Sequence, residues 1–472
     1  MNMELNPRVV AAAASTIAAT IADFAAGLSP AAIPAAVLEC TKLHMLDAVG
    51  NALAATHYDF PHRALTGLRG LGETGRSSLI GLAEKLPLRD AALMNGVLIH
   101  GLDFDDTLPE AIVHPTASTL ACALNVAEHI DAACSDMLAA YIAGVEVATR
   151  IGVAASGAFH SAGFHTTGIA GHLGCSLVAG RLFGLNASQL VMAQGIAGST
   201  ASGSGEYRAE GAWTKRMHPG WAAVGGITAA TLARGGFTGP KRIYEGGDGV
   251  MRSHAGVNFG KVRLDELTAG LGERWIIQEV AIKPFPVCHI LHACADSALA
   301  LRRKHDLKPA DIREVRALLH PESFHYVAEP PSLRRRPPTD YVAKFSVHYV
   351  VATCLVRGRF GFAELEPDAL ADPETLALAE RVSHDVDPQS AFPRYFSGGV
   401  VIKTVDGREL VHMEQVNRGA GDRQLTADEI CTKFDENASL AVSDMRVDEI
   451  RSAVLQAEHS SVRELMRIVS GH

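Results

Sequence analysis

The stretch GIAGHLGCSLVAGRLFGL, residues 168–185, carries the pattern that decides the fold. Wound as a helix, it places the small side chains of Gly171, Cys175 and Ala179 on one face, followed by larger apolar residues. Small residues on a helix face let neighbouring backbones approach closely. Because Arg181 lies within the same stretch, we expect a helix in the core of a soluble domain rather than a membrane helix.

Sequence of the same style extends outward from this stretch, from the N-terminus to about residue 276. Alanine- and leucine-rich segments alternate there with glycine and proline, which is typical of packed helices. One segment predicts a helix from about Trp221 to Arg234, which ends at Gly235 and Gly236.

The N-terminal segment Val9–Ala26 is either a helix or a signal peptide. Ile17, Ile21 and Phe24 recur at helical spacing, and Asp23 would interrupt the apolar stretch of a signal peptide. We therefore predict a helix. No run of about 18 uncharged apolar residues occurs elsewhere, which predicts that the chain has no membrane span.

The pattern changes after residue 279. A helix over His292–His305 is followed by a short strand at Val315–Leu319. Residues of Gly399–Thr404 and Glu409–Gln415 then alternate around Asp406-Gly407, a strong hairpin signal.

Beyond about residue 417 the sequence again predicts helices, over Leu425–Phe434 and Arg446–Ile468. The predicted fold is therefore mainly α. A large all-helical domain is built from both chain ends, residues 1–279 and 416–472, and residues 280–415 form a smaller inserted α/β lid domain.

Composition narrows the function. The 472 residues are 47% hydrophobic and 20% charged, which excludes an intrinsically disordered chain. A net charge of −9 argues against nucleic acid as a partner. The eight cysteines show no CxxC spacing, which predicts reduced thiols and a cytoplasmic protein.

The first candidate cluster is HGLDFDDT at 100–107, followed by His114. Three carboxylates within four positions are costly to bury unless they are paired or hydrogen-bonded. If this segment is a helix end, Asp103 and Thr107 share a face. The alternative is a solvated helix end at which Asp106 and Thr107 are caps.

The second and third clusters are GFHTTG at 163–168 and TKRMHPG at 214–220. The two threonines of the second cluster are predicted N-caps, and His165 then lies where backbone N–H groups favour negative charge. In the third cluster, Lys215 and His218 face one way if the stretch is helical, and a lysine there can bind a carboxylate. Each cluster is also compatible with a structural turn before a helix.

The fourth cluster contains Lys283, Cys288, His289 and His292. Its spacing matches no common zinc pattern, so we predict no metal site, and Lys283 and His289 are candidates for substrate contact. An Arg- and Pro-rich loop at 330–338 is either a solvated turn or the rim of an anion site. No Gly-rich phosphate motif or nucleophile elbow is present. The remaining acids, histidines and lysines suit proton transfer next to a carboxylate.

Together these segments resemble the MmgE/PrpD family, through DFDDT…HP at 103–115, GFHTTG at 163–168, TKRMHPGWAA at 214–223 and KPFPVCH at 283–289. That family includes 2-methylcitrate dehydratase, cis-aconitate decarboxylase and iminodisuccinate epimerase. The resemblance covers nearly the whole chain. It implies a helical body with an α/β lid, a homodimer, an active site between body and lid, and neither a metal nor an organic cofactor.

The resemblance also implies a site of catalytic and substrate-binding residues: catalytic Asp103, His114, His165 and Lys215, and substrate-binding Thr107, Lys283, His289 and Tyr326. We expect the lysines to anchor substrate carboxylates and to stabilise developing negative charge. We expect His114 or His165 to transfer the proton, and Asp103 to orient a histidine or to assist the leaving hydroxyl.

The leading interpretation is a cofactor-independent lyase that removes a proton α to a carboxylate of a small di- or tricarboxylate, in a dehydration like that of 2-methylcitrate dehydratase. The first alternative is an epimerase or isomerase of an acidic substrate, like iminodisuccinate epimerase. The second is a decarboxylase of the cis-aconitate type. A further alternative is a binding protein that has kept the fold without catalysis.

Overall fold

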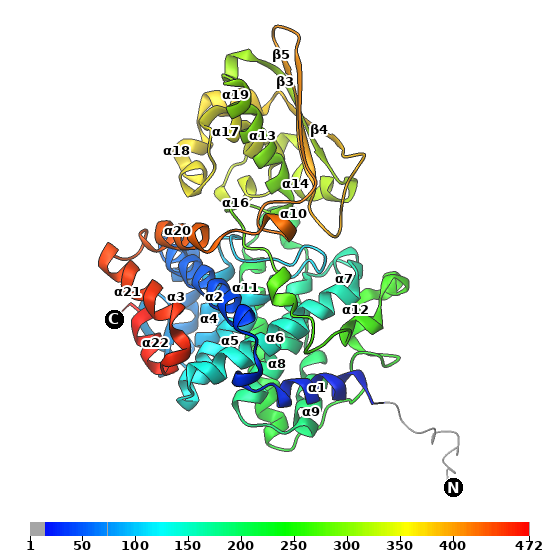
Figure 1. Ribbon diagram of the computed structural model, residues 1–472, viewed down its shortest axis with the longest axis vertical. Coiled ribbons are helices and arrows are strands. Elements are labelled where there is room, and N and C mark those ends of the chain that lie inside the picture. Colours follow the sequence, from blue (N-terminus) through cyan, green and yellow to red (C-terminus); the bar gives the residue numbers. More distant parts are fainter. Residues whose placement is uncertain (1–14, 73, 472) are drawn as a thin grey trace.

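The computed structural model describes residues 15–72 and 74–471. Helices fill the lower body in Figure 1, and the longer strands lie in a smaller upper part. Before residue 280 the helices are α1 (Ile17–Gly27), α2 (Ala35–Ala55), α3 (Asp59–Arg69), α4 (Leu88–His100), α5 (Pro115–Ile130), α6 (Cys134–Ala155), α7 (Ala158–Ser161), α8 (Thr166–Leu182), α9 (Ala187–Gly198), α10 (Tyr207–Glu210), α11 (Thr214–Arg234) and α12 (Val250–Ala255).

The later helices are α13 (His292–His305), α14 (Phe324–Val327), α15 (Pro331–Arg335), α16 (Asp340–Ala343), α17 (Val347–Arg357), α18 (Pro367–Leu370), α19 (Pro373–Ala379), α20 (Ala427–Ala438), α21 (Asp444–Leu455) and α22 (Val462–Val469). The strands are β1 (Ser77–Leu79), β2 (Leu82–Leu86), β3 (Ile312–Leu319), β4 (Val382–Val386), β5 (Gly398–Thr404) and β6 (Glu409–Glu414). The prediction of a mainly helical fold with a small sheet is confirmed.

Helix α8 lies in the middle of the helical body, against α5, α6, α9 and α11. Its small residues permit this packing: a Cβ at Gly171 would lie 2.8 Å from the Ser118 hydroxyl, and one at Gly174 would lie 2.8 Å from the carbonyl oxygen of Gly144. The predicted close approach of backbones is thus confirmed. The helix ends three residues before the predicted end at Leu185, because the chain turns at Gly184 with φ +74°.

Helix α11 begins at Thr214, seven residues before the predicted start at Trp221. The pair Pro219-Gly220 indicates a break in the sequence, but the helix continues through it. A Cβ at Gly96 of α4 would lie 2.4 Å from the Cα of Gly220, so the two backbones are in contact there. Tertiary packing thus overrides the local signal, and Lys215 lies in the first turn of a helix.

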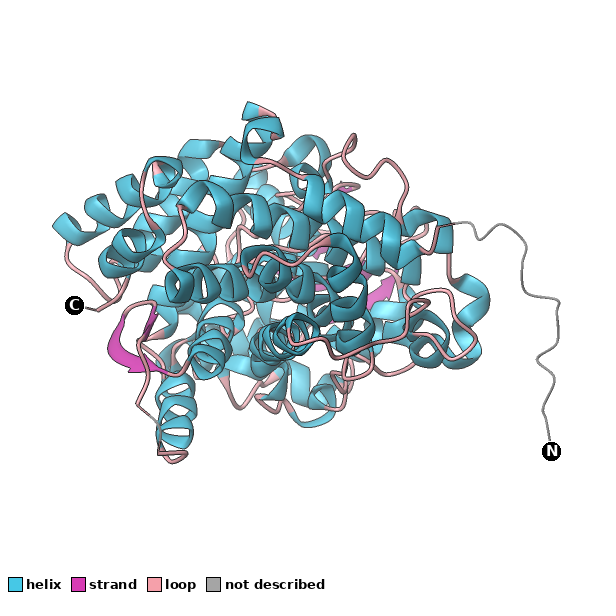
Figure 2. Cartoon of the chain, turned by 90° about the horizontal axis from the view of Figure 1, so that it is seen from below, coloured by secondary structure: helices cyan, strands magenta, loops and turns pink. Residues whose placement is uncertain are grey.

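Both ends of the chain share one core. Buried residues from Ala18 to Val280 and from Phe434 to Val469 form a single apolar cluster, in which α20 and α21 pack on α2 and α22 packs on α5. Figure 2 shows this body from below, made almost wholly of helices. The prediction of one helix over Arg446–Ile468 is wrong in one respect, because the segment forms two helices, α21 and α22, with a turn between them. The Ser460 carbonyl accepts from the N–H of Cys134 at the start of α6, which requires the turn.

The second core is formed by buried residues from Phe285 to Ile402. Its sheet has the strand order β4-β3-β5-β6; β3 and β4 are parallel and the other pairs antiparallel. The predicted hairpin is present, with Lys403 opposite Glu409 and Gly407 at φ +91° in the turn. Strand β4 was not predicted, because most of its side chains are not buried and give no apolar pattern. Helix α13 has the predicted bounds, His292–His305, and it packs on β5 and β6.

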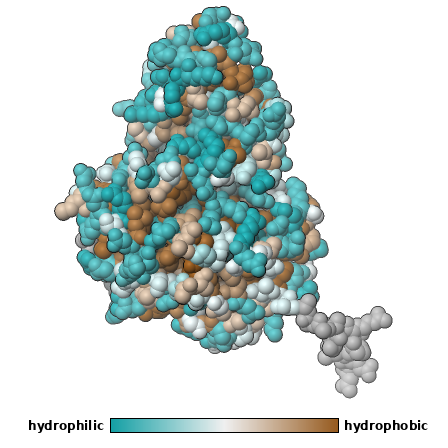
Figure 3. Space-filling model, in the orientation of Figure 1, coloured by the Kyte–Doolittle hydropathy of each residue, from teal (hydrophilic) through white to brown (hydrophobic). Residues whose placement is uncertain are grey.

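Two separate cores support the proposed division into residues 1–279 with 416–472 and residues 280–415, and those boundaries remain a proposal. The body is not all-helical as predicted, because β1 and β2 form an antiparallel hairpin there. In Figure 3 the surface is largely hydrophilic around the upper part, and an apolar patch lies on the body below it.

Two apolar helices bear on the membrane question. Helix α6 is the one helix within residues 15–72 and 74–471 that is long and apolar enough to cross a membrane, and all of its most apolar window is buried inside the fold. It is therefore a core helix. Helix α1 begins at Ile17 with Thr16 as its N-cap; the predicted start at Val9 lies outside the described residues.

Candidate active site

A cavity of about 610 Å³ is lined by residues of the helical body and of the sheet-bearing part. All eight residues predicted for the site line it: Asp103, Thr107, His114, His165, Lys215, Lys283, His289 and Tyr326. Residues separated by more than two hundred positions in the sequence therefore meet at one place. Their roles remain predictions.

A carboxylate bridged by two ammonium groups lies at the floor of the cavity. Asp103 Oδ1 is 2.7 Å from Lys215 Nζ and 3.0 Å from Lys283 Nζ, and all three side chains are buried. Burial alone would raise the pKa of Asp103, but the two lysines hold it well below its ordinary value. Burial would likewise lower the pKa of Lys215, yet Asp103 together with Tyr341 and Tyr207 outweighs burial and raises it. Asp103 and Lys215 are therefore charged at neutral pH.

Three lysines fix the loop that carries Asp103. Lys344 donates to the carbonyl oxygen of Leu102 at 2.6 Å, Lys283 to that of Asp103 at 2.8 Å, and Lys433 to that of Phe104 at 2.8 Å. Asp103 itself has φ +54°, in the left-handed region. Lysine hydrogen bonds to three successive carbonyls hold this conformation, so the loop is set before any substrate arrives. Since α4 ends at His100, Asp103 and Thr107 do not share a helix face.

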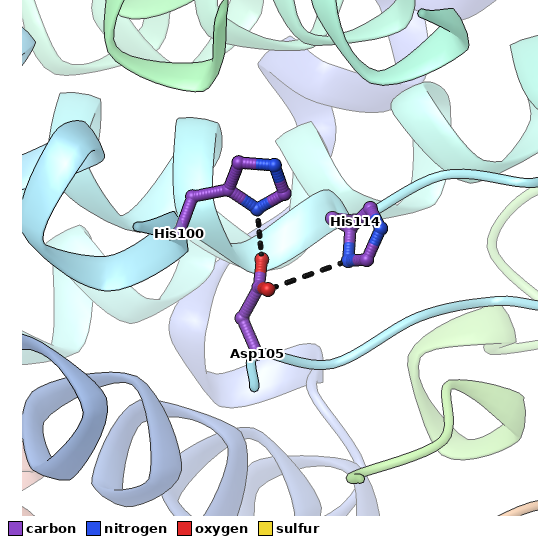
Figure 4. Close-up of side chains that lie close together, drawn as sticks. All are labelled: His100, Asp105 and His114. Atoms are coloured by element: carbon purple, nitrogen blue, oxygen red, sulfur yellow. Dashed lines mark hydrogen bonds and ion pairs between the residues drawn. The ribbon is translucent and has the colours of Figure 1, made fainter. Parts of the chain in front are cut away.

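Asp105 lies between two histidines, as Figure 4 shows. Its carboxylate oxygens are 2.7 Å from His100 Nδ1 and 3.5 Å from His114 Nδ1. Burial would raise the pKa of Asp105, but the two imidazoles hold it far below its ordinary value. Burial lowers the pKa of His100 to about 4, so a neutral ring donates to an ionised carboxylate. Asp105, rather than Asp103, is thus the carboxylate that orients a histidine.

The same three residues are grouped closely enough to be considered as metal ligands. However, His114 Nδ1 also lies 2.9 Å from the carbonyl oxygen of Asp106, a contact that requires a proton on this nitrogen. A protonated nitrogen cannot ligate a metal, so the geometry fits a hydrogen-bonded network better than a metal centre. It leaves Nε2 as the basic nitrogen of His114.

His165 has a second histidine behind it. Its Nδ1 lies 3.0 Å from Nδ1 of His218, so one of the two rings donates to the other. Burial and the neighbouring His218 and Lys215 hold the pKa of His165 well below its ordinary value. His165 is therefore neutral at physiological pH and able to accept a proton.

Three helix N-termini meet at the cavity. His114 is the N-cap of α5, His165 is the N-cap of α8, and Lys215 is the second residue of α11. The positive end of each helix dipole favours a bound anion. The prediction that the threonines cap α8 is wrong: Thr166 and Thr167 lie inside its first turn. The Thr167 hydroxyl instead accepts from the backbone N–H of His114, at 3.0 Å.

The cavity is positively charged although the protein is acidic. Four basic side chains line it, among them Lys261 and Arg208, against two carboxylates, those of Asp103 and Glu322. This arrangement suits a substrate with several negative charges.

Comparison with known proteins matches this chain to a family over most of its length. Residues 19–259 match the MmgE/PrpD N-terminal domain and residues 285–458 the MmgE/PrpD C-terminal domain. The chain belongs to the MmgE/PrpD family. The resemblance noted in the sequence is confirmed.

Curated relatives of this MmgE/PrpD protein are similar along nearly all of its length. The cis-aconitate decarboxylase-like protein oryM of Aspergillus oryzae is 27% identical, over 96% of this chain and 97% of its own. A cis-aconitate decarboxylase of Aspergillus terreus is 27% identical over 94% of each chain. The cis-aconitate decarboxylase of Mus musculus is 27% identical, over 89% of this chain and 86% of its own.

Segments far apart in the sequence also meet around His289 and Tyr326, at the MmgE/PrpD cavity. His289 begins a short 3-10 helix, and its Nε2 lies 2.7 Å from the side-chain nitrogen of Asn417, after β6. Tyr326 lies in α14 and faces Arg208 of α10, whose Nη1 is 3.5 Å from the phenol oxygen. Sequence analysis did not single out Asn417 or Arg208, because neither belongs to a motif.

The Arg- and Pro-rich loop does not form the rim of this cavity. Its middle is the short helix α15, and none of Arg334, Arg335 and Arg336 lines the cavity. Arg336 pairs with Glu380 at 2.7 Å, and Arg334 is buried. The loop is therefore a partly exposed helical turn that lies outside this cavity.

Proposed function

We propose that this MmgE/PrpD protein is a lyase that acts on a small di- or tricarboxylate through a carbanion next to a carboxylate. One observation carries the proposal: two buried lysines converge on Asp103 in a cavity that also presents His114 and His165. The relatives named as cis-aconitate decarboxylases support the same substrate class.

The ammonium groups would stabilise the charge of the intermediate. When the bond to a proton or to a carboxylate breaks, its electron pair delocalises onto a neighbouring carboxylate, which then carries extra negative charge. Lys215, Lys283 and the three helix N-termini are fixed near that charge, in a site that burial shields from water. Neither a metal nor an organic cofactor enters the proposal.

Decarboxylation is the first reaction to test, because the named relatives are decarboxylases. In that reaction the carbon–carbon bond breaks, carbon dioxide leaves, and the carbanion takes a proton from the ammonium group of Lys215. The proton comes back to the enzyme from water.

Dehydration, which sequence analysis ranks first, is the second candidate. It is favoured by the neutral His165 and by the basic Nε2 of His114, since either can remove a proton α to a carboxylate. The C–O bond then breaks, and hydroxide leaves as water after it takes a proton. Epimerisation uses the same first step, with return of the proton to the opposite face.

Product analysis separates these reactions. Purified protein is incubated in deuterium oxide with citrate, 2-methylcitrate, cis-aconitate and iminodisuccinate, and products are followed by NMR. Carbon dioxide release identifies decarboxylation, a new alkene with loss of hydroxyl identifies dehydration, and α-deuteration without further change identifies epimerisation. No change in any acid, together with no binding, would overturn the proposed function.

A homodimer is also part of the proposal. Helix α11 presents an exposed apolar stripe to solvent: Trp213, Met217, Trp221 and Leu232 are each at least 40% exposed. These residues lie on one helical face, as a contact with a second copy requires. Sedimentation velocity that gives a monomer at micromolar concentration would contradict the homodimer.

Cytoplasmic location is proposed as well, supported by eight free cysteines.

A further inference from the structure

Arg208 lines the cavity without an ion pair among the described side chains. Within that set, which leaves out the side chain of Glu210, no carboxylate pairs with its guanidinium, and its one hydrogen-bonding neighbour is the Tyr326 hydroxyl at 3.5 Å. That distance is longer than a normal N–H···O hydrogen bond. A guanidinium has five N–H donors, so most of them are free for a ligand.

Two aromatic rings hold the guanidinium. Its central carbon lies 4.9 Å from the centre of the Tyr326 ring and 5.8 Å from that of the Tyr207 ring. Gly205 provides the space: a Cβ there would lie 2.3 Å from Nη2 of Arg208. The side chain is therefore positioned without an anionic partner among the described side chains.

The segment that bears Arg208 is tied to the histidine loop. The N–H of Gly205 donates to the carbonyl oxygen of Gly163 at 2.7 Å, and the N–H of His165 donates to that of Gly203 at 2.8 Å. Arg208 thus has a fixed place relative to His165, one of the two candidate proton-transfer residues.

The neighbouring imidazoles do not share its charge. The His160 ring lies 4.8 Å from that of Tyr326, and burial together with Arg208 lowers the pKa of His160 to about 3. Burial and Arg208 also lower the pKa of His325. Arg208 is therefore the permanent cation at this wall of the cavity.

We propose that Arg208 binds a carboxylate of the substrate at the Tyr326 wall of the cavity, apart from the pair of lysines on Asp103. This inference rests on the proposed function and extends it. The substrate would then carry one carboxylate more than the lysines bind. The inference therefore favours tricarboxylates over dicarboxylates as substrates. Arg208 is a substrate-binding residue in this account, and the planar guanidinium fits a carboxylate through two parallel bonds.

Equilibrium binding of tricarballylate, an unreactive tricarboxylate, tests this by calorimetry on the full chain. Arg208→Gln should weaken binding roughly ten- to a hundredfold, the effect of losing a charge-assisted contact. Arg208→Lys keeps the charge and should weaken it less. Arg252 gives a matched control, because it also stacks on an aromatic ring, 4.3 Å from that of Phe259, but does not line the cavity. Arg252→Gln should bind as the wild type does.

Turnover of the reacting acid adds a second readout. Arg208→Gln should raise KM by a similar factor and leave kcat within a few-fold, because the bonds that react lie at the lysines. Unchanged tricarballylate affinity and KM in Arg208→Gln would overturn the inference and leave the proposed function intact. Failure of the wild type to bind tricarballylate, citrate or cis-aconitate would overturn the proposed function itself.

Discussion

The two walls of the cavity are built in different ways. On the Asp103 side, three lysine side chains bond to the carbonyls of residues 102–104, and Asp103 has two cationic partners. On the Tyr326 side, Nη1 of Arg208 lies 3.5 Å from the Tyr326 hydroxyl, and the guanidinium packs on the Tyr326 ring. One wall is thus fixed in advance for charge stabilisation, and the other keeps a cation free for a ligand. Four variants test this contrast.

Lys215→Ala is expected to have the largest effect. It removes one of the two ammonium groups on Asp103 and a fixed cation at the developing charge, so kcat should fall about 10²–10³-fold. The measurement is turnover of the reacting acid, with circular dichroism to verify the fold. Lys403→Ala, at an exposed ion pair with Glu314, is the control and should leave kcat unchanged. Near wild-type turnover in a folded Lys215→Ala protein would remove the assigned role.

Lys433→Met should have the largest effect on stability. The ammonium group lies 2.6 Å from Asp47 Oδ1 and bonds to the Phe104 carbonyl, and all of this is buried. Loss of one partner of a buried pair should cost about 3 kcal/mol in the free energy of unfolding, measured with denaturant. Lys403→Met is the matched exposed case and should cost no more than about 0.5 kcal/mol. Equal costs would show that the buried Lys433 stabilises the fold no more than the exposed Lys403 does.

Lys344→Met should change how stability depends on pH. Burial lowers the pKa of Lys344 from 10.5 to about 7. Between these values the unfolded chain binds the extra proton, so this lysine makes wild-type stability rise with pH, by up to about 1.4 kcal/mol per unit. Below pH 7 both states are protonated and the slope vanishes. Wild-type minus variant stability should therefore increase from pH 7 to 9.5. A constant difference would contradict the lowered pKa.

Tyr326→Phe should have the smallest effect on stability. Because its hydroxyl contact is long, its loss should change the free energy of unfolding by less than about 0.5 kcal/mol. Tyr349 offers the contrast, since its buried hydroxyl donates to the Glu364 carbonyl at 2.7 Å. Tyr349→Phe should cost about 1 kcal/mol. If Tyr326→Phe were the more costly of the two, the Tyr326 wall would be as firmly fixed as the other.

Local patterns predicted much of the fold. Helix α13 begins and ends where the apolar spacing predicts, and the β5–β6 hairpin turns at Asp406-Gly407. These features depend on neighbours in the sequence. The start of α11 was misplaced because the contact of Gly220 with Gly96 overrides a local break, and β4 was missed because it has no apolar period of its own.

The order of residues along the chain sets which chemical groups are neighbours in the sequence. These are the carboxylates of residues 103–106, the segments that carry His114 and His165, and the later motifs that carry Lys215 and Lys283. The tertiary structure decided their partners. It paired Asp103 with lysines and Asp105 with His100 and His114, and among the described side chains it gave Arg208 no carboxylate. The physical reason is that Coulomb energy and burial depend on distance in space, and Lys215 and Lys283 approach Asp103 only once the helical body has packed.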